Sequence, residues 1–226
     1  IRDICSLQEK KEEDKSSTNN YRPISLLPVF SKILEKLMAD RIGDFLKHFN
    51  VLFKHQYRFR KGFSTIHPIV HFLNHIAEAN NKKQFTLAIF VDLTKAFDTV
   101  NHKILFKKTE YYGFRGVALK WFKSYLSGRQ QCVAIGNSTS AYRSITIGVP
   151  QGSILGPILF LLYINDLPNA TTLLPFLFAD DTTCVKSGSD LPSLFQEVNL
   201  EFQKLGEWFR ANKLSLHPGK TKYSIF

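Results

Sequence analysis

Residues 176–185 read FLFADDTTCV, in which two adjacent aspartates, Asp180 and Asp181, separate two apolar runs. This pattern predicts a tight β-hairpin with apolar arms and both carboxylates at its tip. Upstream, residues 85–92 read FTLAIFVD, a β-rich run that predicts a buried strand ending at Asp92. Because strand ends of one sheet can meet in the folded protein, we expect the three carboxylates to lie close together.

Three carboxylates at strand ends suit two Mg²⁺ ions. Phosphoryl transfer to a 3′-hydroxyl uses two cations about 3.5–4 Å apart. Mg²⁺ is usually held by one or two carboxylates together with substrate phosphates and water. Adjacent carboxylates repel each other, and a bound cation relieves that repulsion. An isolated Asp-Asp pair is more often ordinary turn chemistry, so the metal hypothesis depends on the neighbouring motifs.

The composition is that of a folded, basic protein. Hydrophobic residues make up 44% of the 226 residues, which argues against a disordered chain. Lys and Arg number 30 against 19 Asp and Glu, a formal net charge of +11. That excess suits a polyanion such as nucleic acid, although an anionic membrane attracts the same charge.

The cysteines argue against a disulfide-stabilised protein, and the apolar runs argue against a membrane-spanning one. Cys5, Cys132 and Cys184 are far apart and form no CxxC motif, which predicts free thiols in a reducing compartment. The most apolar stretch, residues 154–164, is too short for a transmembrane helix, so we expect no membrane association.

Apolar residues at helical spacing predict four helices, over residues 30–49, 66–77, 154–165 and 194–209. Residues 8–20, QEKKEEDKSSTNN, contain no aliphatic or aromatic side chain and predict a solvated linker or loop. A turn at Pro218–Gly219 is expected between two final strands. Strands and helices that do not alternate regularly predict an α+β fold.

Three histidines, His67, His71 and His75, lie four residues apart on the helix expected over residues 66–77. This spacing could indicate a metal site. However, the histidines occupy the non-apolar face, and neither a Cys nor a carboxylate nearby completes a tetrahedral ligand set. The interpretation we favour is a solvated stripe.

Seven motifs resemble, in order, the conserved blocks of reverse transcriptases, and in spacing most resemble those of non-LTR (LINE-type) retrotransposons. The three core motifs are VDLTKAFDTVNH (91–102), GVPQGSILGPILFLLYINDLP (148–168) and FADD (178–181). The others are NYRPISLLPVFSKILEK (20–36), HQYRFRKGFST (55–65), GVALKWFKSYLSGRQQ (116–131) and NKLSLHPGKTKYSIF (212–226). The resemblance covers about residues 20–226.

The resemblance implies that Asp92 and Asp180 are the principal ligands of two Mg²⁺ ions, for which Mn²⁺ can substitute. Asp181 is the third, more peripheral carboxylate. Lys220 matches a lysine proposed to protonate the leaving pyrophosphate. Read without the resemblance, it is a single lysine beside a turn.

The same resemblance assigns nucleotide-binding residues. Phe97 matches the bulky steric gate that crowds a ribose 2′-OH, while Gln151 and Gly152 match the motif that lines the nucleotide pocket. Arg60 and Lys61 match triphosphate-binding cations. From the residues alone, Phe97 is equally a core side chain, and Arg60 and Lys61 are equally a solvated basic loop.

By resemblance, the architecture is a right hand with fingers and palm and without a thumb. The palm is expected to be a mainly antiparallel sheet backed by helices. The expected ranges are a linker or partial fingers element at 1–20, fingers at 21–84 and 106–148, and palm at 85–105 and 149–226, the last part truncated.

The implied function is RNA-dependent DNA polymerisation, with an RNA template, a DNA primer and dNTPs as partners and the nucleus as the expected location. A truncated or domesticated copy that binds RNA without polymerising is one alternative. An RNA-dependent RNA polymerase is another, against which Phe97 argues. Two residues depart from the family: Arg58 stands where Gly is usual, in a turn expected to need positive φ, and His217 replaces a common Asn.

Overall fold

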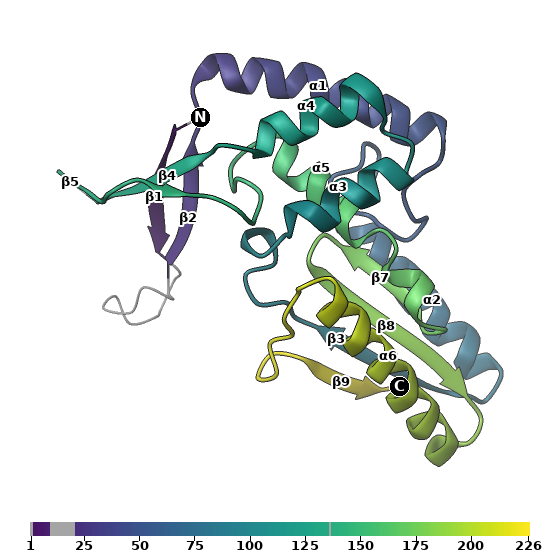
Figure 1. The fold of residues 1–226 in the computed structure, drawn as a ribbon. Helices are drawn as coiled ribbons and strands as arrows, with labels where there is room; N and C mark the ends of the chain where they lie inside the picture. Colours follow the sequence, from purple (N-terminus) through teal and green to yellow (C-terminus); the bar gives the residue numbers. More distant parts are fainter. Residues whose placement is uncertain (1, 10–20, 136) are drawn as a thin grey trace. The chain divides into compact units, whose positions relative to one another are not determined.

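The computed structural model describes residues 2–9, 21–135 and 137–226 (Figure 1). The chain forms two compact units: a first unit of Ile1–Phe49 with Phe97–Phe160, and a second unit of Asn50–Ala96 with Leu161–Phe226. These changes of unit fall at positions other than the expected ends of fingers and palm. The assignment of residues to fingers and palm therefore stays a prediction.

The sheet of the first unit is built around β1 (Arg2–Glu9), which pairs antiparallel with β2 (Tyr21–Leu26) and parallel with β4 (Gln130–Ile135). Short strands β5 (Ser138–Thr139) and β6 (Arg143–Ser144) both pair with β4. The predicted linker is wrong at residues 8 and 9, which belong to β1. These two residues pair with Arg22 and Tyr21 of β2, and such backbone pairing can hold a polar segment as a strand. Residues 10–20 of that prediction lie outside the described residues.

Helix α1 (Val29–His48) confirms the helix expected over residues 30–49. Its buried side is formed by Glu35, Ala39, Ile42 and Leu46. The apolar Ile33, Leu34 and Leu37, which helped to predict the helix, are each more than half exposed. The spacing therefore predicted the helix, and its apolar positions Ile42 and Leu46 are buried, whereas others of its apolar positions are exposed.

Two further helices of the first unit, α3 (His102–Tyr111) and α4 (Gly116–Leu126), fall in a stretch for which the periodicity predicted no element. The side chain of Asn101 caps α3 by accepting a hydrogen bond from Ile104 N. Helix α5 (Leu155–Ile164) confirms the predicted apolar helix and continues from the first unit into the second.

The second unit holds an antiparallel sheet in the order β7 (Leu174–Phe178), β8 (Asp181–Gly188), β3 (Phe85–Val91) and β9 (Lys222–Ile225). This confirms the predicted hairpin and the strand before Asp92. Of the two strands expected at the end of the chain, only β9 forms. The earlier one is reduced to a single bridge between Leu216 and Leu93.

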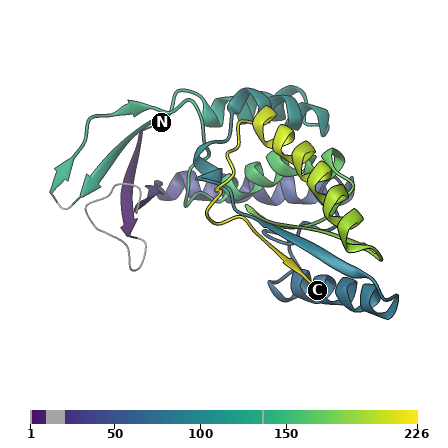
Figure 2. The ribbon, with the colours of Figure 1, turned by 90° about the horizontal axis from the view of Figure 1, so that it is seen from below.

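Helices cover both faces of this sheet. Figure 2 shows the strands between α6 (Leu191–Ala211), which confirms another predicted helix, and α2 (Ile66–Asn81). Strand β3 is buried on both sides: Ala88 packs in a cluster with Tyr57, Phe176 and Val185. Because side chains alternate along a strand, Leu87, Ile89 and Val91 point to the opposite face, and these three are buried as well. This burial explains the nearly continuous apolar run of β3.

Helix α2 confirms the helix expected over residues 66–77. The interpretation of its histidines as a solvated stripe holds for His71, which is exposed, but not for His67 and His75, which are half-buried. His71 Nδ1 lies 2.7 Å from the hydroxyl oxygen of Tyr57, and His75 Nε2 lies 3.1 Å from the hydroxyl oxygen of Ser187. The apolar side chains of Ile66, Ile69 and Leu73 are instead more than half exposed. Hydrogen-bonding partners distant in sequence therefore override the amphipathic pattern.

Cys5, Cys132 and Cys184 are free thiols, and all three are buried. Among the helices in the described part of the chain, none combines the length and the apolar character needed to cross a membrane.

Candidate catalytic and nucleotide-binding residues

The second unit brings the three aspartates together. Asp92 directly follows β3, and Asp181 is the first residue of β8. Since Val91 pairs with Thr182 in the antiparallel register, Asp92 comes next to the end of β8 that carries Asp181. Asp180 occupies the turn between β7 and β8.

The charges of these carboxylates act on one another. Loss of hydration raises the pKa of the Asp181 carboxyl, although part of that side chain remains accessible to water. The negative charges of Asp180 and Asp92 raise the same pKa further, while Arg58 lowers it. The carboxylates therefore form an acidic cluster in which added negative charge is unfavourable and a cation is favoured.

The backbone of Asp92 is held by the segment that contains Lys220. His217 N donates a hydrogen bond to Asp92 O at 2.8 Å, and Thr94 N donates to Ser215 O at 2.8 Å. Lys220 N in turn donates to His217 O at 3.1 Å, and the Lys220 side chain is exposed. The structure thus places the turn that carries Lys220 beside the backbone of Asp92.

The basic segment at residues 58–61 is only partly as expected. Arg60 Nη1 donates to the carbonyl oxygens of Phe53, at 3.1 Å, and Gln56, at 2.9 Å. These bonds give Arg60 a structural role in its own loop, whereas Lys61 is exposed. The backbone has positive φ at Phe59, at 55°, and not at Arg58. The positive φ expected at Arg58 therefore lies one residue further along the chain.

Three predicted nucleotide-binding residues lie in the first unit. The Phe97 ring stacks on Phe160, with centroids 4.5 Å apart. Gln151 Nε2 donates to Asp98 Oδ1 at 2.7 Å. Gly152 has φ of 90°, and an added Cβ would come within 3.0 Å of Ile24, so this position requires glycine.

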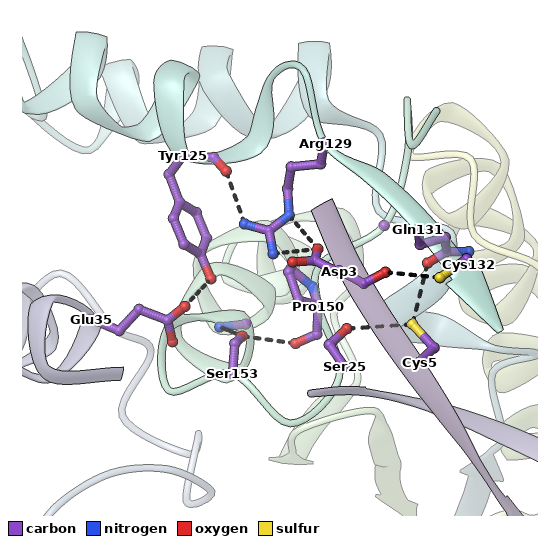
Figure 3. A network of polar contacts seen from close by, with 12 residues as sticks. Asp3, Cys5, Ser25, Glu35, Tyr125, Arg129, Gln131, Cys132, Pro150 and Ser153 are labelled. Atoms are coloured by element: carbon purple, nitrogen blue, oxygen red, sulfur yellow. Dashed lines mark hydrogen bonds and ion pairs between the residues drawn. The ribbon is translucent and has the colours of Figure 1, made fainter. Parts of the chain in front are cut away.

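The turn that carries Gln151 is supported by a polar network that the sequence patterns did not reveal (Figure 3). The Glu35 carboxylate accepts hydrogen bonds from Tyr125 Oη and from Ile154 N, both at 2.7 Å. Burial and the Glu35 charge raise the pKa of the Tyr125 hydroxyl, which therefore stays a donor. Ser153 Oγ accepts from Gly156 N at 2.8 Å, a hydrogen bond of the kind that caps the N-terminus of a helix.

The sequence carries one sign that the Glu35 carboxylate takes part in hydrogen bonding. Glu35, Ala39, Ile42 and Leu46 share one side of α1, where a carboxylate stands among small and apolar residues. Such a carboxylate must find donors when the face is buried.

Within residues 2–9, 21–135 and 137–226, no group of three or more His, Cys, Asp or Glu side chains is arranged to hold a metal ion.

Known proteins resemble this chain in sequence. A probable RNA-directed DNA polymerase from transposon BS of Drosophila melanogaster is 34% identical, over 94% of this chain and 24% of that protein. The RNA-directed DNA polymerase from the mobile element jockey of Drosophila funebris is 32% identical, over 89% of this chain and 23% of that protein. This chain thus spans about a quarter of the length of these relatives.

Solved structures of telomerase share the fold. The apo telomerase of Candida tropicalis, truncated from its C-terminal domain, aligns with a TM-score of 0.65 at 12% identity, covering 100% of this chain and 50% of that one. Telomerase of the same organism with a fragment of telomeric RNA also aligns at 0.65, with 14% identity over 99% and 41% of the two chains.

The reverse transcriptase (RNA-dependent DNA polymerase) family matches residues 9–225, nearly the whole chain. The two relatives given above come from mobile elements, transposon BS and jockey, and both are RNA-directed DNA polymerases by name. The chain belongs to the reverse transcriptase family, as a domain of the non-LTR, LINE-type retrotransposon kind.

Proposed function

We propose that this chain carries the polymerase residues of an RNA-dependent DNA polymerase, which transfers nucleotides from dNTPs to the 3′-hydroxyl of a DNA primer on an RNA template. The observation that carries the proposal is the meeting of Asp92 with Asp180 and Asp181 at the ends of paired strands β3 and β8. Family membership supports the same chemistry.

The donor set fits Mg²⁺, for which Mn²⁺ would substitute. All three side chains offer carboxylate oxygens, and their mutual repulsion favours a bound cation. Mg²⁺ is usually held by one or two carboxylates together with substrate phosphates and water, so three aspartates offer enough protein ligands. When bound, two ions would lower the pKa of the primer hydroxyl and neutralise the triphosphate.

We further propose the roles that the family resemblance implies for the remaining residues. Phe97 would crowd a ribose 2′-OH, and Gln151 and Gly152 would line the nucleotide pocket. Lys61 is exposed and would offer its ammonium to a triphosphate. Arg60 Nη1 already donates to two carbonyl oxygens of its own loop, so Arg60 would bind a triphosphate through its other guanidinium N–H groups. Lys220 would protonate the leaving pyrophosphate.

The proposed partners are an RNA template and a DNA primer, and the proposed location is the nucleus. The net charge of +11 supports binding to nucleic acid. A solved relative in fold, the Candida tropicalis telomerase, has been captured with a fragment of telomeric RNA.

Primer extension by the full-length parental protein, with Mg²⁺ or Mn²⁺, tests the proposal. We expect Asp180→Asn to lower incorporation by at least about 100-fold, since it removes a charge that would act in the transition state. Asp190→Asn is the matched control. It makes the same substitution in the same unit, at an aspartate that caps α6 by accepting a hydrogen bond from Ser193 N.

Three results would count against the proposal. Unchanged incorporation by Asp180→Asn would remove that carboxylate from the site. RNA binding without any incorporation by the parental protein would favour the domesticated copy, and a preference for NTPs over dNTPs would favour an RNA polymerase.

A further inference from the structure

The turn that carries Asp180 contains an energetically unfavourable backbone conformation. Ala179, directly before Asp180, has φ of 60°, a conformation that residues other than glycine adopt only at an energetic cost. Positive φ at the first turn residue is typical of a type II′ hairpin, a position that glycine usually fills. Something outside the turn must therefore stabilise Ala179 in this conformation.

The amide of Ala179 is also without a partner from its own hairpin. The hairpin pairs Phe178 with Asp181, so the N–H of Ala179 lies outside the strand ladder. Ala179 is only 4% exposed, and an unpaired N–H there would be costly. Gln56 Oε1 accepts this hydrogen bond at 3.3 Å.

Gln56 is itself held firmly in place. It is 1% exposed, and its Oε1 also accepts a hydrogen bond from Arg58 N at 3.1 Å. Its segment runs parallel to β7: Leu177 N donates to His55 O at 2.8 Å, and Tyr57 N donates to Leu177 O at 2.9 Å. This single parallel bridge brings the Gln56 amide to the hairpin turn.

We propose that Gln56 is a positioning residue for Asp180. By accepting the hydrogen bond of Ala179 N–H, Gln56 keeps the turn in its positive-φ conformation and so sets the direction in which the Asp180 carboxylate leaves the backbone. This inference rests on the proposed function of Asp180 in nucleotide transfer. Gln56 need not contact nucleotide or primer.

Two substitutions at this position separate the acceptor from the rest of the side chain. Gln56→Met keeps the length of the side chain but removes the acceptor. Gln56→Glu keeps an acceptor oxygen, and it loses no hydrogen bond on the other side, because Gln56 Nε2 is buried without a partner in the described part of the chain. Burial and the neighbouring aspartates favour the protonated form of this new carboxyl, whose carbonyl oxygen can still accept from Ala179 N.

Asn165→Leu is the matched control. The Asn165 amide is a comparable brace in the same unit, accepting from Phe53 N and donating to Val51 O, both at 2.8 Å. It holds a neighbouring part of the same loop, and none of its described hydrogen bonds reaches the hairpin turn.

The first measurement is amide hydrogen exchange of Ala179 and Asp180 in the full-length protein, which does not require activity. We expect Gln56→Met to speed exchange of the Ala179 amide by about ten-fold or more, and Gln56→Glu to restore protection. The Asn165→Leu variant should exchange there at the wild-type rate. Unchanged protection of Ala179 in Gln56→Met would overturn the inference.

The second measurement is primer extension, in which a misplaced carboxylate should lower kcat and leave nucleotide binding nearly intact. We expect Gln56→Met to lower kcat by about 10- to 100-fold, with KM for dNTP changed by less than about three-fold. Wild-type kcat in Gln56→Met, or an equal loss in Asn165→Leu, would refute the positioning role. If the wild-type protein itself does not extend primers, the proposed function fails, and hydrogen exchange still decides whether Gln56 holds the turn.

Discussion

The buried ion pair between Arg129 and Asp3 should be strongly destabilising when only one partner is removed. Arg129 Nη2 lies 2.5 Å and Nε 3.0 Å from Asp3 Oδ2, and the side chains are 2% and 0% exposed (Figure 3). At an effective dielectric constant of about 20, this separation corresponds to an attraction of about 7 kcal/mol. Desolvation of the two ions costs several kcal/mol each and offsets most of it.

The net contribution of the pair is therefore small, but a single substitution leaves a buried carboxylate without its cation. Arg129→Met should lower the free energy of unfolding by about 3–5 kcal/mol. The double variant Asp3→Leu/Arg129→Met removes both charges. It should recover to within about 1–2 kcal/mol of the wild-type value.

Urea unfolding followed by tryptophan fluorescence measures both variants. The Trp121 ring stacks on Tyr125, 5.4 Å between centroids, and Arg129 Nη1 donates to Tyr125 O at 3.2 Å, so Trp121 reports on this region. A Trp208→Phe background removes the other tryptophan. A loss below about 1 kcal/mol for Arg129→Met, or a double variant as unstable as the single one, would refute the reasoning.

Three further predictions concern other parts of the molecule. Hydrogen bonds from Lys204 and from Thr172 N lower the pKa of Glu201 from its ordinary 4.5 to about 2. The stabilisation from this carboxylate is therefore present above pH 4.5 and is lost as the pH falls towards 2, so the melting temperature of Glu201→Gln should depend less on pH in this window than that of wild type. Tyr57→Phe removes a hydroxyl that lies 2.7 Å from each of two histidine nitrogens and should cost about 1–3 kcal/mol in urea unfolding. Gly148→Ala, with φ of 84° and an added Cβ 2.7 Å from Asp98 O, should cost at least about 1–3 kcal/mol in the same assay.

Much of the second unit could be predicted from local patterns. The β-rich run before Asp92 and the apolar arms around Asp180 each specify a strand, because alternation and turn chemistry act over a few residues. The same patterns could not reveal the end of β1, whose residues 8 and 9 are polar and are held by pairing with β2. They predicted helix α2 but not the hydrogen-bonding partners that His71 and His75 find outside it.

By itself, the sequence determined that carboxylates end strand β3 and occupy the β7–β8 turn, and its ordered motifs identified the family. Only the tertiary structure decided what holds those carboxylates and the neighbouring turns. Gln56 reaches Ala179 across 123 residues, and Glu35 reaches Ile154 across 119. The physical reason is that a turn leaves backbone N–H groups unpaired, and the chain satisfies them with side chains that come near only after folding.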